Sequence, residues 1–175
     1  MTVLSVDIPV IETERLILRA PQESDFEAHA TFMASDRSHF IGGPTDRYQA
    51  WRGFSSALGH WMLRGYGGWT MTLQSDGTPV GRSGYIFGEG WQEPEIGWHV
   101  YGAFEGKGYV FEAAEAILKI GPAKFGLDKV ISYIDPANTR SAALAERLGA
   151  VLECKSELLG KPCNIYRHRS YAGGE

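Results

Sequence analysis

The chain has 175 residues, of which 43% are hydrophobic and 22% are charged, and its formal net charge is -4. This length and composition predict one globular domain, residues 1–175, that buries a full hydrophobic core. The net negative charge argues against a nucleic acid as the main partner, and it leaves room for a cationic or amine-bearing substrate.

The sequence offers no motif for a metal centre or a membrane anchor. The two cysteines, Cys154 and Cys163, lack metal-ligand spacing and are too few for a disulfide framework, so we expect plain thiols and no metal. The first ten residues have neither a basic start nor a long apolar run, and no stretch approaches the ~20 apolar residues that span a bilayer. We therefore expect a cytoplasmic protein with no membrane partner.

The N-terminal third predicts a strand followed by two helices. Polar and apolar residues alternate over 14–19, which indicates a strand, and either Ser24 or Asp25 is placed to cap a short helix after it. Apolar residues recur at spacings of three and four over 47–63, which predicts a longer second helix. Two residues of this helix are expected to pack in the core: Trp51 and Trp61.

The rest of the chain alternates strands with two helices, and its turns are marked by glycine or asparagine. We expect strands over 65–73, 79–88, 95–101, 129–134, 151–158 and 164–169, and helices from about 109 to 125 and over 138–150. This order predicts a mixed α/β (α+β) fold, with a mostly antiparallel central sheet of about seven strands and helices on both faces.

Gly106 and Gly108 stand between a predicted strand and a predicted helix. The first amides of a helix have no internal partner, and glycines let an anion approach them, so this arrangement is typical of a phosphate site. The Walker motif is excluded because Gly108 follows Lys107, and the dinucleotide fingerprint lacks its third glycine at Phe111. Two glycines alone leave a simple tight turn as the alternative.

Two longer stretches carry a resemblance to a known family. "EIGWHVYGAFEGKGYVFEAAEAIL" and "ISYIDPANTRSAALAERLGAV" resemble the GCN5-related N-acetyltransferase (GNAT) superfamily, and within it the branch of the ribosomal-protein N-terminal acetyltransferases. The family's acetyl-CoA motif, Gln/Arg-x-x-Gly-x-Gly/Ala, maps onto residues 105–110. Its second signature maps onto Asn138, Ser141, Leu148, Gly149 and Ala150, and the resemblance extends from "TERLILR" to the final strand.

The resemblance implies a GNAT-like fold in which the strands at 95–101 and 129–134 splay apart. It implies acetyl-CoA as co-substrate, with the pantetheine arm pairing along the backbone of Trp98, His99 and Val100, and with Asn138 and Ser141 in contact with the coenzyme. The pyrophosphate is expected on the amides of six residues: Glu105, Gly106, Lys107, Gly108, Tyr109 and Val110.

Two of these positions depart from the family pattern. Glu105 replaces the usual Gln or Arg, which puts an acid beside a diphosphate, although solvent screens a carboxylate that points outward. Val110 replaces the usual Ala or Gly. We therefore expect the coenzyme to be held less closely than in relatives.

Acetyl transfer to an amine needs a group that takes the proton of the amine. The resemblance draws this base from the start of the strand at 95–101, where Glu93 and Glu95 stand, and we favour Glu95. Many relatives carry the base one position earlier, at Pro94 here, so the register is left open. An ordered water is an alternative base, and both glutamates also fit plain solvated acids at the end of a strand. His99 is a further candidate because imidazole titrates near neutral pH, although a structural histidine fits the same position.

The departing thiolate needs an acid, and the thioester carbonyl needs a hydrogen-bond donor. By resemblance Ser141 is the expected acid, because Ala145 stands where many relatives have a tyrosine. A water or Tyr133 are the alternatives, and Ser141 also fits a plain first-turn serine. Asn138 is expected to cap its helix in addition to any contact with the coenzyme. A main-chain N–H near Val100 is expected to polarise the carbonyl.

The acceptor is expected to be a primary amine, either a protein or peptide N-terminus or a small molecule. Asp36, Asp46 and Glu89 are acids that could receive an ammonium group. Direct transfer in a ternary complex is expected, because no Cys–His pair suggests an acetyl-enzyme. The rival hypothesis is a non-catalytic acyl-CoA-binding or regulatory module, and the sequence leaves open whether the chain forms a homodimer.

Overall fold

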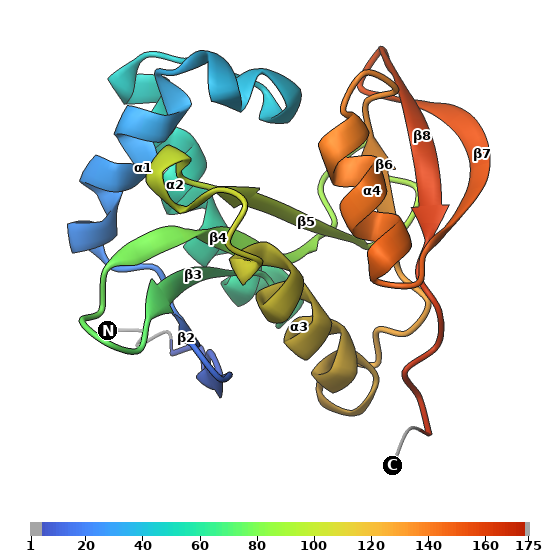
Figure 1. Ribbon diagram of the computed structural model, residues 1–175, viewed down its shortest axis with the longest axis horizontal. Coiled ribbons are helices and arrows are strands. Elements are labelled where there is room, and N and C mark those ends of the chain that lie inside the picture. The colour runs from blue at the N-terminus through green and yellow to red at the C-terminus, as the bar shows by residue number, and fades with distance from the viewer. Residues whose placement is uncertain (1–4, 174–175) are drawn as a thin grey trace.

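Eight strands form one sheet in the computed structural model, which describes residues 5–173 (Figure 1). The strand order is β1-β2-β3-β4-β5-β6-β8-β7, and neighbouring strands are antiparallel except for β5 and β6, which are parallel. Residues 1–4 and 174–175 lie outside the described residues. Residues 1–4 are part of the N-terminal stretch from which we expect no signal peptide.

The strands are β1 (Ile11–Glu12), β2 (Leu16–Arg19), β3 (Gly68–Leu73), β4 (Pro79–Ile86), β5 (Glu95–Val100), β6 (Ile131–Ile134), β7 (Val151–Leu158) and β8 (Lys161–Arg167). The helices are α1 (Phe26–Met33), α2 (Arg47–Arg64), α3 (Tyr109–Phe125) and α4 (Thr139–Arg147), and the short 3-10 segments are η1 (Glu23–Asp25), η2 (Asp36–Ile41) and η3 (Gly102–Phe104). The predicted fold class is confirmed. The strand beyond the expected seven is β1, whose two residues are too few to show an alternation.

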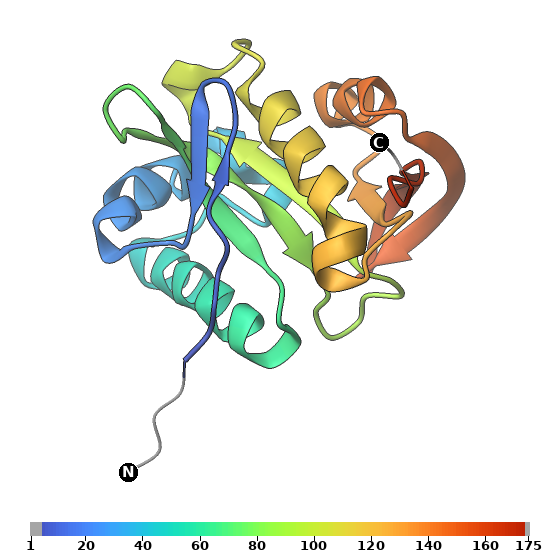
Figure 2. The ribbon, with the colours of Figure 1, turned by 90° about the horizontal axis from the view of Figure 1, so that it is seen from below.

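Helices cover both faces of the sheet (Figure 2). On one face α3 packs Ala114 and Ile117 against apolar side chains of β2 to β5, and on the other face α1 and α2 form a second core. Trp61 is fully buried as predicted, with its ring edge-on to Trp69 at 4.8 Å. The prediction for Trp51 was wrong: this side chain is 41% exposed, because its position on α2 lies at the margin of the second core.

β5 and β6 separate after their first residues. Glu95 and Ile131 form the register pair between them in the described chain, and beyond it side chains replace the backbone ladder. The Ser132 hydroxyl donates to the Ile96 carbonyl at 2.7 Å, and the Tyr133 amide donates to the Glu95 carboxylate at 3.1 Å. From Gly97 to Val100, β5 therefore pairs with β4 on one side and borders a gap on the other. We call this divergence the fork; it is the splay that the sequence led us to expect.

Candidate functional site: a groove through the fork

The turn before α3 exposes a run of backbone amides. Gly106 and Gly108 have φ values of +73° and +81°, a left-handed conformation that glycine adopts readily. The first hydrogen bond of the helix runs from the Glu112 amide to the Gly108 carbonyl at 3.1 Å. The amides from 106 to 111 have no backbone acceptor within residues 5–173, and with the helix dipole they suit an anion such as a phosphate.

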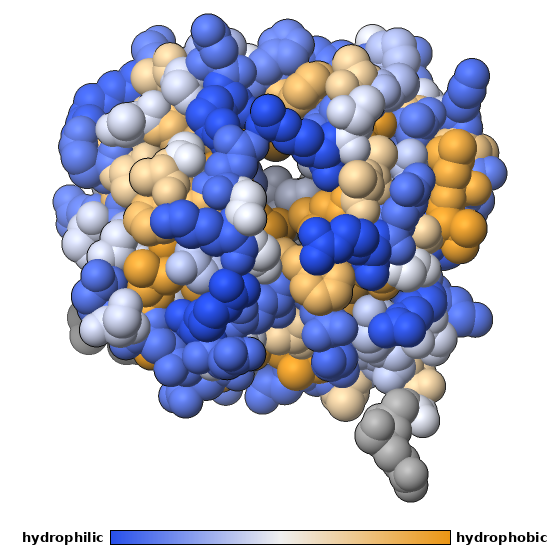
Figure 3. Space-filling view, viewed as in Figure 1, coloured by the Kyte–Doolittle hydropathy of each residue, from blue (hydrophilic) through white to orange (hydrophobic). Residues whose placement is uncertain are grey.

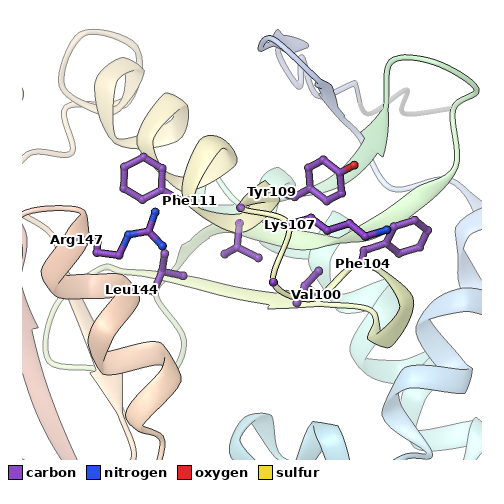
Figure 4. A pocket seen from close by; sticks show the side chains of 10 residues that line it. Val100, Phe104, Lys107, Tyr109, Phe111, Leu144 and Arg147 are labelled. Atoms are coloured by element: carbon purple, nitrogen blue, oxygen red, sulfur yellow. The ribbon is translucent and has the colours of Figure 1, made fainter.

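A groove leads from this turn through the fork. It consists of two adjoining hollows, of about 360 and 680 Å³, which share Val100, Gly106, Val110 and Leu144. The smaller hollow is the phosphate side, and there Figure 4 shows Arg147 of α4 beside Phe111, with the guanidinium carbon 4.8 Å from the ring centroid. The larger hollow is the acceptor side, which continues between η2 and α4 and opens near the centre of the face in Figure 3.

The side chains of Trp98 and Ser141 meet across the fork. Trp98 Nε1 donates to Ser141 Oγ at 3.3 Å, and the Ser141 amide donates to Asn138 Oδ1 at 3.2 Å. The second bond confirms Asn138 as the N-cap of α4. These three residues line the groove with His99, Val100, Glu105 and Val110, while Lys107, Gly108 and Tyr109 line its phosphate side, so the expected coenzyme residues lie along one continuous surface.

Glu105 bridges two arginines at the mouth of the groove. Its carboxylate accepts hydrogen bonds from Arg37 of η2 and from Arg140 of α4. The hydrogen bond from Arg37 holds the pKa of the Glu105 carboxyl below its usual range. The acid that departs from the family pattern is therefore paired, and it connects the elements on either side of the opening.

Glu95 lies at the closed end of the fork. Its carboxylate accepts hydrogen bonds from Trp91 Nε1 at 2.8 Å and from the Tyr133 amide, and burial raises its pKa. It is not among the residues that line the groove, so it can reach an acceptor only through an intervening water. The alternative base Glu93 pairs with Arg167 at 2.6 Å. The alternative acid Tyr133 accepts from the Gln92 amide at 3.0 Å and is not among the residues that line the groove.

His99 lines the acceptor side and stacks on Phe32 of α1, with ring centroids 4.8 Å apart and planes 8° apart. Its Nε2 atom is buried without a hydrogen-bond partner in the described structure. Burial, followed by the neighbouring positive charge of Arg82, lowers the pKa of His99 well below its usual range. The imidazole is therefore neutral at pH 7 and is a weak proton acceptor.

The acids proposed for the acceptor have separate locations. Asp36 of η2 lines the acceptor side. Asp46 instead caps α2 by accepting from the Gln49 amide at 2.8 Å, and Glu89 is exposed in the turn between β4 and β5.

The sequence reasoning missed three arginines of the groove: Arg37, Arg140 and Arg147. Arg140 stands inside the Asn-x-x-Ser signature, which was the one available signal. Arg37 belongs to η2, a segment for which the sequence predicted no element. Within residues 5–173 there is no cluster of three or more potential metal ligands, and none of the helices is long and apolar enough to cross a membrane.

The chain is similar to several known proteins. Residues 15–151 match the family model of the acetyltransferase (GNAT) domain. An acetyltransferase from Agrobacterium tumefaciens is 36% identical, with a TM-score of 0.88 over 97% of this chain and 99% of that one. A GNAT-family acetyltransferase from Bacillus anthracis is 25% identical, with a TM-score of 0.74 over 91% and 96% of the two chains.

Two further matches add less, one because its identity is low and the other because it covers less than half of each chain. A ribosomal L7/L12 alpha-N-protein acetyltransferase solved with coenzyme A is 19% identical, with a TM-score of 0.76 over 94% of this chain and 99% of that one, which supports the fold alone. The uncharacterized protein YkkB of Bacillus subtilis is 34% identical, but the match spans only 44% of this chain and 45% of that protein.

The family model covers most of the chain, and the Agrobacterium relative aligns along nearly all of it. The eight-stranded sheet agrees with the structural match. The chain therefore belongs to the GNAT acetyltransferase family.

Proposed function

We propose that this chain is an acetyl-CoA-dependent N-acetyltransferase that moves an acetyl group to a primary amine by direct attack in a ternary complex. The observation that carries the proposal is the continuity of the groove: free amides suited to a phosphate lie at one end, and the gap beside β5 lies in its middle. The solved relative with coenzyme A supports a coenzyme in this fold, although its low identity leaves the acceptor open.

In this proposal the pyrophosphate binds the free amides from Gly106 to Val110, whereas the amide of Glu105, expected from the sequence to take part, donates to the Gly102 carbonyl at 3.4 Å. The backbone edge of β5 from Trp98 to Val100 that faces away from β4 is proposed to pair with the pantetheine arm, and Asn138 and Ser141 are proposed to contact it from α4. The Val100 amide is proposed to donate to the thioester oxygen as negative charge develops there. This assignment uses groups that border one groove.

The chemistry requires the amine to lose a proton and the thiolate to gain one. The attacking nitrogen forms a bond to the carbonyl carbon, and the carbon–sulfur bond then breaks. Ser141 is proposed to protonate the sulfur and to regain a proton from solvent, because its hydroxyl accepts from Trp98 and keeps its own proton free to donate. Glu95 is proposed as the base that takes the amine proton through a water, because burial raises its pKa and so makes its ionised carboxylate a stronger base.

Release of free coenzyme A from acetyl-CoA, measured across a panel of amines, tests this proposal. We expect turnover with at least one primary amine, and we expect coenzyme A but not ATP to protect the protein against thermal unfolding. Binding of coenzyme A without turnover on any amine would support the rival hypothesis of a non-catalytic acyl-CoA-binding module. Protection by ATP alone would contradict both.

A further inference from the structure

A row of polar side chains crosses the sheet beneath α1 and α2. Arg19 of β2 stands opposite Thr70 of β3, Thr70 stands opposite Arg82 of β4, and Arg82 stands opposite His99 of β5. Directly paired residues on adjacent strands point to the same face of a sheet. The row therefore leads from the edge of the sheet to His99, which lines the acceptor side of the groove.

The two arginines of this row have different surroundings. Arg19 forms a two-pronged ion pair with buried Asp25, through hydrogen bonds of 2.7 and 2.8 Å. Arg82 is only 9% exposed, yet it has no hydrogen bond and no ion pair with any residue between 5 and 173. The face of the Phe54 ring lies 5.2 Å from its guanidinium carbon, and the neighbouring acid, Asp25, acts on Arg82 only through space because its ion pair is with Arg19. A buried cation without a counterion is strongly unfavourable unless another group supplies the missing charge.

Other unpartnered polar atoms gather around Arg82. His29 Nδ1, His99 Nε2 and the Tyr101 hydroxyl are all buried without a hydrogen-bond partner in the described chain. The rings of His29 and Tyr101 each lie 5.8 Å from the ring of His99. A phenol and a neutral imidazole can each donate one hydrogen bond, so several potential donors lie near the positive charge of Arg82, and the acid beside it, Asp25, is already paired with Arg19.

We propose that Arg82, with Tyr101, His29 and His99, forms a buried carboxylate-binding subsite behind His99, which lines the acceptor side, and that the acceptor is a small amino acid. A guanidinium binds a carboxylate through two parallel hydrogen bonds, which gives both affinity and orientation. The assignment of the amine rests on the proposed function, whereas the assignment of the carboxylate rests on the unpaired charge of Arg82.

The spacing of the sheet fits such an acceptor. Neighbouring strands lie about 4.8 Å apart, so Arg82 is one strand away from β5, along which the thioester is proposed to lie. In an amino acid the carboxylate is separated from the amine by one or a few carbon atoms. Such a molecule places its carboxylate beside Arg82 while its amine remains near His99 and the fork. The amine of a long polyamine or of an aminated sugar would bring no anion to Arg82.

Binding of a carboxylate can be tested without catalysis. In protein labelled with 15N-arginine, propionate is expected to shift the side-chain Nε resonance of Arg82 saturably, and propionamide, which has the same shape without the charge, is expected not to shift it. The Arg82→Met variant assigns the resonance, and the Arg19 resonance serves as an internal control because that guanidinium is already paired. A propionate titration that leaves Arg82 unmoved, or that moves every arginine alike, would overturn the subsite.

Turnover tests the acceptor class. We expect kcat/KM for L-alanine or L-phenylalanine to exceed that for ethylamine or 2-phenylethylamine by about 100-fold in at least one of the two pairs, because a site built for a polar group rejects an analogue that lacks it. Arg82→Met should abolish this preference, and Arg82→Lys should keep part of it. Equal rates within both pairs, or faster reaction of the amines, would overturn the proposal.

Two further arms separate the remaining explanations. A peptide amide beginning with aspartate offers the same carboxylate from a protein N-terminus; a preference for it over free amino acids would overturn the small-molecule assignment. If no amine of any kind is acetylated while propionate still shifts Arg82, the transferase function fails and the subsite stands.

Unfolding of the unliganded variants is the structural control: Arg82→Met should not lower the melting temperature, whereas Arg19→Met should. A large loss for Arg82→Met would show that its charge is already compensated and would contradict the proposal.

Discussion

Glu105 changes the charge at the proposed phosphate site. The carboxylate stands in the coenzyme motif, but it pairs with Arg37 and Arg140 rather than remaining free beside the phosphate site. Each pair is partly exposed and therefore contributes little to stability. The main effect is electrostatic, because the carboxylate neutralises cations that would otherwise attract a diphosphate.

Glu105→Gln should therefore tighten the binding of coenzyme A by roughly 3- to 10-fold at low salt, since removing one negative charge near a phosphate is worth on the order of 1 kcal/mol. Isothermal titration at two salt concentrations measures it, with the larger gain expected at low salt. Glu153→Gln is a matched control, because that acid pairs with Arg167 away from the groove. Weaker binding by Glu105→Gln would contradict this account.

Glu95→Gln should lower kcat by at least about 10-fold while the dissociation constant of acetyl-CoA stays unchanged, because removing a general base typically costs about 100-fold or more, and a partial loss is expected when a water carries the proton. The single oxygen of the glutamine amide can accept from only one of the two donors, Trp91 Nε1 or the Tyr133 amide, so the unchanged dissociation constant of acetyl-CoA is also the check that the fork keeps its geometry. Glu93→Gln, which breaks the ion pair with Arg167 of β8, is the control. An unaltered kcat for Glu95→Gln with a good substrate would remove this residue from the base role.

At the scale of elements, helix α3 has a glycine in the left-handed conformation at each end, Gly108 before it and Gly126 after it. The positive φ of Gly108 disfavours any side chain, and an added Cβ would lie 3.4 Å from the Arg15 guanidinium, which itself stacks on Tyr109. Gly126 ends the same helix with φ of +68° and has no neighbour within 4 Å of an added Cβ. The two glycines therefore differ in their surroundings rather than in their backbone.

Gly108→Val and Gly126→Val should each destabilise the fold by about 1–2 kcal/mol through left-handed strain. Only Gly108→Val should also weaken coenzyme A binding, by at least about 10-fold if one or two amide contacts to the phosphate are lost. Chemical denaturation and titration calorimetry separate the two effects. Equal affinity in both variants would place the phosphate site elsewhere.

Most elements could be predicted from the sequence because local periodicity sets them. The helix at 47–63 was predicted within one residue of α2 (Arg47–Arg64), and the cap by Asn138 followed from its position before a helical pattern. The groove residues Gly106, Gly108 and Ser141 were accessible only because a short motif carries them. The partners of Glu105 were not, since Arg37 is 68 residues away from it in the sequence and the contact depends on how η2 packs.

The same limit explains Arg82 and Glu95. The strands that carry them were predicted. The sequence did not predict that Arg82 Nε would lack a hydrogen-bond partner, or that Glu95 would accept from Trp91 and from the Tyr133 amide, because these contacts depend on residues of other elements. An alternating pattern predicts which face a side chain occupies, and it does not predict which group it meets there.

At the scale of the whole molecule, the sheet consists of two parts joined at the fork, with β1 to β5 on one side and β6 to β8 on the other. His168, at the end of β8, is 1% exposed and shares a 3.0 Å hydrogen bond with Ser132, whose hydroxyl also donates to β5. The bond from Ser132 to Ile96 ties the two parts together, and because it uses the hydroxyl proton, His168 Nε2 donates to the Ser132 oxygen and helps to orient it.

Burial lowers the pKa of His168 to about 4. In the unfolded chain the histidine has a pKa of about 6.5 and binds a proton more readily than in the folded protein. The contribution of His168 to the free energy of unfolding is therefore fully present above pH 6.5 and is lost as the pH falls toward 4. Between pH 7.5 and pH 5.0 the free energy of unfolding should drop by roughly 2 kcal/mol more in the wild type than in His168→Gln. Urea denaturation at both pH values measures the difference. The same pH dependence in both proteins would contradict this assignment.

The account depends most on the groove that runs through the fork. A crystal structure of the protein with coenzyme A tests it directly. We expect the diphosphate on the amides between residues 105 and 111, and the thiol beside Ser141 after the pantetheine arm has passed along β5. A coenzyme bound on another surface, or a fork closed by backbone pairing of β5 with β6, would contradict the account.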